Sequence, residues 1–315
     1  MSLKVFALAT KGSTQKGEVM EAMMPNKGGT VFVLAGGGGL GAVQVGMLYA
    51  LLEGGIRPDA IVGTSIGALN GAFLAGHPDL AGIDELAELW SSVRLRDVFP
   101  LSVRGLARGL FGHQEFLFQS VGLQSVIRRA HLGYSNLEDA PIPIHVVATD
   151  LKTGGAVTIS EGQAVEALLA SSAIPGVFPP VQVGGRRLVD GGVVADVPVL
   201  EAEALGATRI YVLPTLPFDL PLRPSNALLM MQRAMSMVSW PVTRAALESV
   251  ASRVDVRVLS APDAAGESSM FDFRVTRRLI DEAYEATATY LANDRTDRTG
   301  IKNGVTGTSS SLVRA

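Results

Sequence analysis

The feature that most constrains this chain is the pentapeptide Gly63-Thr64-Ser65-Ile66-Gly67, which has the pattern G-x-S-x-G. An apolar run at 60–62 precedes it and predicts a buried strand, and small residues at helical spacing follow it at 68–76. A serine at such a strand-to-helix turn has an exposed hydroxyl on a strained backbone, and the two glycines let neighbouring backbone approach closely. The pattern therefore predicts that Ser65 is a nucleophile. The alternative is a tight turn in which the serine has no chemical role.

A run of four glycines precedes this pentapeptide in the chain. Residues 30–35 are apolar and β-branched, which predicts a buried strand, and a helical pattern begins at Gly41. The backbone amides of the intervening loop are suited to stabilise a developing oxyanion. We therefore expect oxyanion donors at Gly36, Gly37 and Gly38.

The same loop fits the dinucleotide-binding fingerprint G-x-G-x-x-G. That interpretation requires an acidic residue at the end of the second strand, where it would bind a ribose hydroxyl. The nearby acid, Asp59, stands before that strand instead. The cofactor interpretation therefore lacks its second element.

The rest of the chain alternates apolar runs with helical patterns, which predicts an α/β fold: a three-layer α/β/α sandwich around a mostly parallel sheet. One domain is expected over 29–293, with disordered segments at 1–28 and 294–315. Strands are expected at 142–149, 156–159, 181–183, 187–189, 208–213 and 254–259, and helices at 84–94, 119–131, 163–171, 196–205, 226–253 (interrupted near Trp240-Pro241) and 275–292.

Composition excludes several classes of function. The chain has no cysteine, so disulfides, thiolate metal sites and a cysteine nucleophile are ruled out. Its net charge of −3 comes without a basic stripe, which argues against a nucleic-acid partner. No apolar run reaches 18 residues despite a mean hydropathy of +0.29, so no membrane-spanning helix is expected. We expect a cytoplasmic protein, peripheral at the membrane at most.

A serine hydroxyl needs a base, and the four histidines are poor candidates for it. In α/β-hydrolases the order is serine, acid, histidine, but no histidine follows His145. His145 lies within an apolar strand and fits a core residue, whereas His77, His113 and His131 fit the surface.

Asp190 is the stronger candidate for the base. It ends a predicted strand and precedes Gly191 and Gly192, which allow a loop to wrap closely around a site. A carboxylate in an apolar pocket has a raised pKa and becomes a usable general base. The alternative is an aspartate that only forms the turn before two glycines.

Taken together, three motifs resemble those of the patatin-like phospholipases. They are the loop from Gly36 to Gly41, the elbow from Gly63 to Gly67, and Asp190-Gly191-Gly192; the stretch at 170–180 is similar as well. The resemblance covers about residues 30 to 292. It implies a Ser65–Asp190 dyad, hydrolysis of fatty-acyl esters of phospholipids or lysophospholipids through an acyl-enzyme, and no metal or organic cofactor.

The chain departs from that family at Leu40, where arginine or lysine is usual. A cation there would favour an anionic transition state or a phosphate head group. We therefore expect the substitution Leu40→Arg to keep or raise turnover.

Two further stretches are ambiguous. Residues 95–118 mix Leu and Phe with Arg, which fits a lid over an apolar pocket, a membrane-facing surface, or an ordinary segment that covers the core. The methionines Met230, Met231, Met235 and Met237 fit core packing better than membrane contact.

Two other functions remain open on the sequence alone. One is a soluble esterase or thioesterase that uses the same dyad. The other is a non-catalytic module that binds lipid or nucleotide through the glycine loop.

Overall fold

The computed structural model describes residues 29–99, 112, 114–217, 227–269 and 272–300. Within them, eight strands form one sheet in the order β5-β6-β3-β2-β1-β7-β8, with β4 paired to β3. The parallel part comprises β3 (Ile144–Asp150), β2 (Ala60–Thr64), β1 (Thr30–Leu34), β7 (Arg209–Leu213) and β8 (Asp255–Val258). Antiparallel pairs add β4 (Ala156–Ile159), β5 (Val181–Val183) and β6 (Arg186–Asp190). The predicted mostly parallel α/β fold is confirmed.

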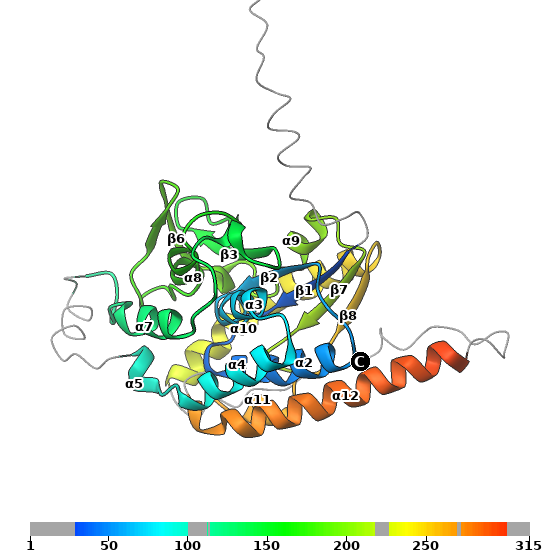
Figure 1. The fold of residues 1–315 in the computed structure, drawn as a ribbon. Helices are drawn as coiled ribbons and strands as arrows, with labels where there is room; N and C mark the ends of the chain where they lie inside the picture. The colour runs from blue at the N-terminus through cyan, green and yellow to red at the C-terminus, as the bar shows by residue number, and fades with distance from the viewer. Residues whose placement is uncertain (1–28, 100–111, 113, 218–226, 270–271, 301–315) are drawn as a thin grey trace, which may run out of the picture.

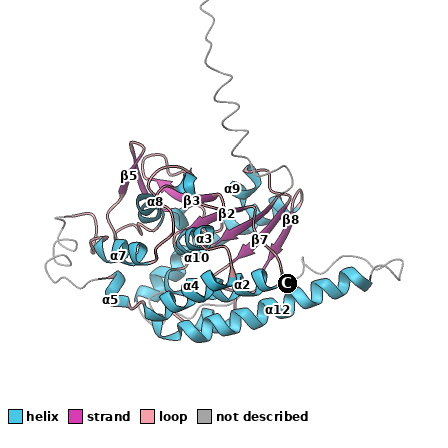
Figure 2. Cartoon of the chain, viewed as in Figure 1, coloured by secondary structure: helices cyan, strands magenta, loops and turns pink. Residues whose placement is uncertain are grey.

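Helices cover both faces of this sheet (Figures 1 and 2). One face carries α2 (Ala42–Glu53), α3 (Ile66–Gly76), α4 (Leu80–Ser92), α8 (Ala164–Ser171) and α12 (Thr276–Gly300). The other carries α9 (Val199–Ala204) and α10 (Ala227–Ala251). Shorter helices are α5 (Leu95–Val98), α7 (Val121–Arg129) and α11 (Asp263–Glu267). In Figure 1 the long helix α12 runs beside α2 and α4, and it contacts both.

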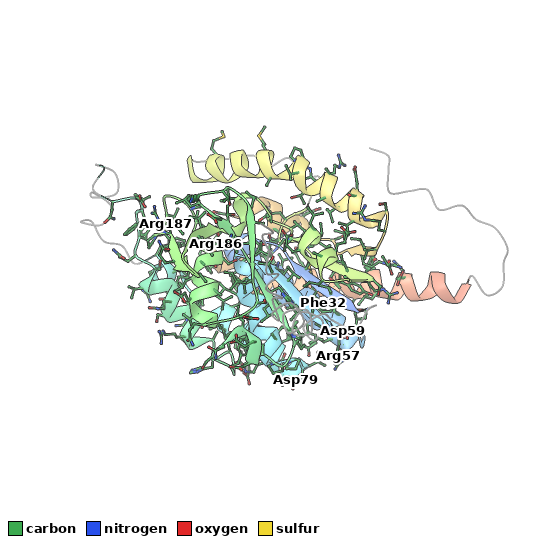
Figure 3. The ribbon with its side chains drawn as sticks, turned by 90° about the horizontal axis from the view of Figure 1, so that it is seen from above. Phe32, Arg57, Asp59, Asp79, Arg186 and Arg187 are labelled. Carbon is green, nitrogen blue, oxygen red and sulfur yellow. The ribbon has the colours of Figure 1, made fainter. Side chains whose placement is uncertain are left out.

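Strand β1 shows why the central strands are apolar along their whole length. Phe32 and Leu34 point into the core beneath α2 and α3, while Val31 and Val33 point into the core beneath α9 and α10. All four are fully buried, and Figure 3 labels Phe32 within the body of the molecule. A strand that is covered on both faces has no polar side.

Close packing of helices on the sheet depends on small residues. A Cβ on Gly71 would lie 2.7 Å from Ile61 Cγ2, and a Cβ on Gly46 would collide with the backbone oxygen of Ile280 in α12. Glycine at these positions lets α3 approach the sheet and α12 approach α2.

Some predicted boundaries are wrong. Helix α10 continues through Pro241, because a proline removes one backbone donor and a long helix tolerates that loss, and α12 runs past 292 to Gly300. Helix α9 begins at Val199 and not at 196, and α11 was not predicted.

The core interpretation of the methionines is wrong for two of them. Met230 and Met237 are 55% and 62% exposed. Figure 3 shows sulfur-tipped side chains that project outward from the yellow helix α10. The side chains of Met231 and Met235 lie outside the described residues, as does the segment 1–28. Of the tail predicted to be disordered, 294–315, residues 301–315 lie outside them too, whereas 294–300 belong to α12.

Among the helices of the described ranges, none combines the length and the apolar character that crossing a bilayer requires.

Candidate active site

The site lies where the carboxyl ends of several strands meet on one side of the sheet. Leu34 near the end of β1 is in register with Gly63 of β2, so the glycine loop and Ser65 emerge side by side. On the next strand, Val147 of β3 pairs with Thr64, and its neighbour Ala148 pairs with Asp190 at the end of β6. The sheet therefore brings together residues that are 125 positions apart.

Ser65 occupies a strained turn between β2 and α3. Its φ of 53° and ψ of −121° lie outside the regions that non-glycine residues ordinarily adopt. A Cβ on Gly63 would lie 2.6 Å from Ala68 Cα, and one on Gly67 would collide with the carbonyl oxygen of Leu34. Both flanking glycines are thus required by close backbone approach, as the pentapeptide predicts.

Ser171, at the end of α8, holds this turn in place. The backbone N–H of Ser65 donates to Ser171 Oγ at 2.8 Å, and Ser171 Oγ donates to the carbonyl oxygen of Val147 at 2.6 Å. Ser171 is fully buried. The sequence did not single it out, although it lies within the stretch at 170–180 that resembles the family.

Ser65 and Asp190 are in direct contact. Ser65 Oγ donates a hydrogen bond to Asp190 Oδ2 at 2.7 Å, and the backbone N–H of Gly192 donates to Asp190 Oδ1 at 2.8 Å. The two side chains are buried, at 9% and 6% exposure. Thr149 Oγ1 donates to the backbone oxygen of Asp190 at 2.9 Å, which anchors this turn to β3. A Cβ on Gly191 would collide with the carbonyl oxygen of Val147, so that position also requires glycine.

The surroundings of Asp190 raise the pKa of its carboxyl. Burial raises the pKa of this carboxyl to about 7, against the hydrogen bonds from Ser65 and Gly192, which lower it; the nearby carboxyl of Asp196 raises it further. A pKa near neutrality is suited to a general base that must accept and release a proton at each turnover.

The glycine loop offers fewer donors than expected. The N–H of Gly36 donates to the backbone oxygen of Asp196 at 3.0 Å, so it is not available to an oxyanion, contrary to the expectation for this residue. The amides of Gly37, Gly38 and Gly39 donate to no other group in the described part of the chain. They stand at the start of a 3₁₀ turn, Gly38–Gly41, that continues into α2, and a helix N-terminus favours negative charge.

Two of these glycines also need their backbone freedom. Gly37 has a φ of 147° and Gly38 a φ of 57°, both in the region that favours glycine. A Cβ on Gly37 would collide with Thr215, whose hydroxyl donates to the carbonyl oxygen of Gly36 at 2.5 Å.

A buried polar network clamps both ends of the loop. Gln44 Nε2 donates to the carbonyl oxygen of Ala35 at 2.8 Å, and Asn70 Nδ2 donates to that of Gly41 at 2.9 Å. Asn70 also donates to Gln44 Oε1, and Trp90 Nε1 donates to Asn70 Oδ1, both at 2.9 Å. Helices α2, α3 and α4 thereby fix the loop between Ala35 and Gly41. Sequence reasoning missed these residues, because single polar residues in apolar helices carry no motif.

Leu40 does not face the site. Its side chain is fully buried in the core on the α2 face of the sheet. An arginine there would place a charge in an apolar core, which argues against the expectation that Leu40→Arg keeps or raises turnover.

An apolar pocket opens beside Ser65. It has a volume of about 110 Å³, and Gly38, Gly39 and Ser65 are among the residues that line it. Apolar side chains of α3, α4 and α7 line most of it, and Val98 and Phe99 from the predicted lid segment contribute to its wall. Residues 100–111 and 113 of that segment lie outside the described residues. The pocket suits a hydrocarbon chain whose carboxyl end reaches Ser65.

The histidines of the described ranges take no part in this group of residues. Within the described ranges, no histidine forms a hydrogen bond with Ser65 or Asp190. His145 is buried in β3, where burial lowers its pKa, and His77 stacks on Phe73. His131 is exposed, and His113 lies outside the described residues.

Asp59 has a structural role at the opposite end of the strands, where β1 and β2 begin. Its Oδ2 accepts a hydrogen bond of 2.7 Å from the N–H of Thr30, where β1 begins. Asp59 thus stands at the start of β2, and the end of that strand, Thr64 followed by Ser65, has no acidic residue for a ribose. Nor do the described residues include a group of three or more acids and histidines placed to hold a metal ion.

Comparison with known proteins agrees with the motifs. The family model described as patatin-like phospholipase matches residues 32–203. An uncharacterized NTE family protein of Mycobacterium tuberculosis is 33% identical over 175 residues, which are 55% of this chain and 45% of that protein. The lysophospholipase NTE1 of Candida glabrata is 31% identical over 57% of this chain and 10% of its own length. Among solved structures, VipD from Legionella pneumophila aligns with a TM-score of 0.46 and 15% identity, over 85% of this chain and 67% of that one. The chain thus spans less than half the length of these two relatives.

Proposed function

Because this chain belongs to the patatin-like phospholipase family, we propose that it is a serine acyl hydrolase that cleaves fatty-acyl esters of phospholipids or lysophospholipids. The observation that carries the proposal is the 2.7 Å hydrogen bond from Ser65 Oγ to Asp190 Oδ2, beside unpaired glycine amides and an apolar pocket.

In the first half of the proposed reaction, Ser65 Oγ attacks the ester carbonyl while Asp190 takes the hydroxyl proton. Negative charge develops on the carbonyl oxygen, and the N–H groups of Gly37 and Gly38 stabilise it. Asp190 then gives its proton to the departing alcohol, and the acyl group remains bound to Ser65.

In the second half, Asp190 takes a proton from a water molecule, which attacks the acyl-enzyme and releases the fatty acid. The pocket along α3, α4 and α7 holds the acyl chain throughout, which supports long-chain substrates over short ones. The raised pKa of Asp190, about 7, supports its role in both proton transfers.

Lipid substrates imply transient contact with a lipid surface. Helix α5 offers support for this part of the proposal, because Leu95 is 45% exposed while Val98, on the same helix, lines the pocket. A chain that enters past α5 would meet apolar surface before it meets Ser65.

The test is labelling with a fluorophosphonate that carries a long alkyl chain. The wild-type protein should become labelled, and Ser65→Ala should not. Ser92→Ala, which removes an exposed hydroxyl of α4, serves as the matched control and should label like wild type. Equal labelling of Ser65→Ala, or an unlabelled wild type with intact circular dichroism, would refute the proposal.

A further inference from the structure

The side chain of Asp196 lies against the reacting groups, although the sequence suggested only a helix start there. A Cβ on Gly36 would lie 2.5 Å from Asp196 Oδ1 and 3.6 Å from Ser65 Cβ. A Cβ on Gly192 would lie 3.2 Å from the same Asp196 oxygen and 3.1 Å from Asp190 Oδ1. The carboxyl of Asp196 therefore stands between the glycine loop and the turn that carries the base.

No cation among the described residues balances this second carboxyl. In the described part of the chain, Asp196 forms no side-chain hydrogen bond or ion pair. Neither its pKa, which burial raises to about 6, nor that of Asp190 is influenced by a lysine or arginine. Leu40, the side chain after the glycine run, is apolar and buried in the core. Above about pH 7 the site therefore holds two negative charges close together.

Asp196 also stands apart from the acyl pocket. Gly38, Gly39 and Ser65 contribute to the lining of that pocket, whereas Asp190, Gly192 and Asp196 do not. If the acyl chain fills the pocket, the alcohol half of the ester extends from the carbonyl carbon toward the side where Asp196 lies. Asp196 is half-buried, whereas Asp190 is buried.

We infer that Asp196 is a specificity-determining residue that selects, by repulsion, acyl esters whose leaving alcohol carries no net negative charge. This inference rests on the proposed function and narrows its substrate class. Neutral glycerol and zwitterionic glycerophosphocholine are accepted as leaving groups, and glycerol phosphate is disfavoured. A like charge placed near an unpaired carboxylate weakens binding most where no cation compensates it.

The experiment compares three esters with one acyl chain and different leaving alcohols: 1-oleoylglycerol, 1-oleoyl-lysophosphatidylcholine and 1-oleoyl-lysophosphatidate, each in neutral detergent micelles at about pH 8. For the wild type we expect kcat/KM to fall in that order. Asp196→Asn should raise kcat/KM for lysophosphatidate relative to oleoylglycerol on the order of 5- to 10-fold, the size of one partly screened charge contact. The backbone oxygen that accepts from Gly36 is kept in this variant.

The matched control is Asp281→Asn, which removes the same charge from an exposed position on α12 and should leave the ratio unchanged. Asp196→Ser gives a second variant with a small neutral side chain, in case the asparagine variant folds poorly. Wild-type protein that cleaves lysophosphatidate as fast as oleoylglycerol overturns the inference without any variant. So does an unchanged ratio in the Asp196 variants that still react with fluorophosphonate. Failure of wild type to cleave any of the three esters counts against the proposed function instead.

Discussion

Two pairs of carboxylates, at opposite ends of the parallel strands, have opposite surroundings. Where the parallel strands begin, Asp59 accepts a backbone hydrogen bond from Thr30, and Asp255 accepts from Arg257 at 2.6 Å and from Arg209 at 2.8 Å. Where β1 and β2 end, Asp190 and Asp196 lie side by side without a cation among the described residues.

The pKa values of Asp255 and Asp190 differ accordingly. Burial alone would raise the pKa of Asp255, but its hydrogen bonds with Arg257 and Arg209 lower it overall. Burial raises the pKa of Asp190 to about 7 with no such compensation. The negative charge on Asp255 therefore stabilises the fold. The negative charge on Asp190 destabilises the fold and makes a base available near neutral pH.

The largest expected effect comes from Asp190→Asn. The asparagine Oδ1 can still accept from the N–H of Gly192, but its Nδ2 can only donate to Ser65 Oγ and cannot take a proton, so kcat should fall on the order of 10³-fold or more. The fall in kcat is measured as turnover of the three oleoyl esters named above. Turnover within about tenfold of wild type would remove Asp190 from the mechanism.

The same variant should gain stability. The folded-state pKa of Asp190 is raised, so its destabilising effect is absent below about pH 4, grows from pH 4 to 7 and is complete above about pH 7. Urea unfolding at about pH 8 should show a gain on the order of 2 to 4 kcal/mol for Asp190→Asn, and no gain at about pH 4. A loss of stability at pH 8 would contradict the comparison between the two ends.

Leu40→Arg tests whether a cation can be supplied beside the loop. Because Leu40 is fully buried, the arginine would have to bury a charge or disrupt the core, and we expect a stability loss of roughly 3 to 5 kcal/mol. Thermal unfolding measures it, with Leu40→Met as the volume-matched control. A variant as stable as wild type would show that the loop can turn this side chain toward the site.

The pH profile of kcat/KM tests the raised pKa of Asp190 directly. Only ionised Asp190 accepts a proton, so activity should fall about tenfold per pH unit below about pH 7 and level off above it. A soluble ester is used, so that micelle charge does not contribute. An acid limb near pH 4 would show that the site does not raise the pKa of Asp190.

The smallest effect is expected for Asp255, where β8 begins. Asp255→Asn removes the partner of Arg209 and Arg257 but leaves the site untouched. Since these groups are partly exposed, we expect a loss of only about 0.5 to 1 kcal/mol near neutral pH, with activity unchanged. It is measured by the same urea unfolding, and its sign should be opposite to that of Asp190→Asn.

The sequence predicted the parts of the molecule whose local pattern has one physical explanation. Strands buried on both faces appear as short apolar runs, so β1, β2 and β7 were found within a residue or two. The glycines around Ser65 and Asp190 are required because neighbouring backbone lies too close for a Cβ atom. Their spacing in the sequence therefore indicated both turns, although it did not show that the two turns meet.

What was missed depends on contacts between distant segments. Ser171, Gln44 and Asn70 lie on apolar helices, and only the folded sheet shows which backbone groups they reach. The same holds for Gly36, whose amide is taken by the backbone of Asp196, and for Leu40, whose burial depends on where α2 packs.

Strand β3 has a consequence for how this chain tolerates change. It pairs with β2 on one side and with β6 on the other, so two steps of about 4.8 Å each separate the strands that carry Ser65 and Asp190. Hydrogen bonding between strands sets that separation, and the connecting loops do not. Insertions or deletions in those loops, such as the turn at 151–155, should leave the hydroxyl and the carboxylate within reach of each other.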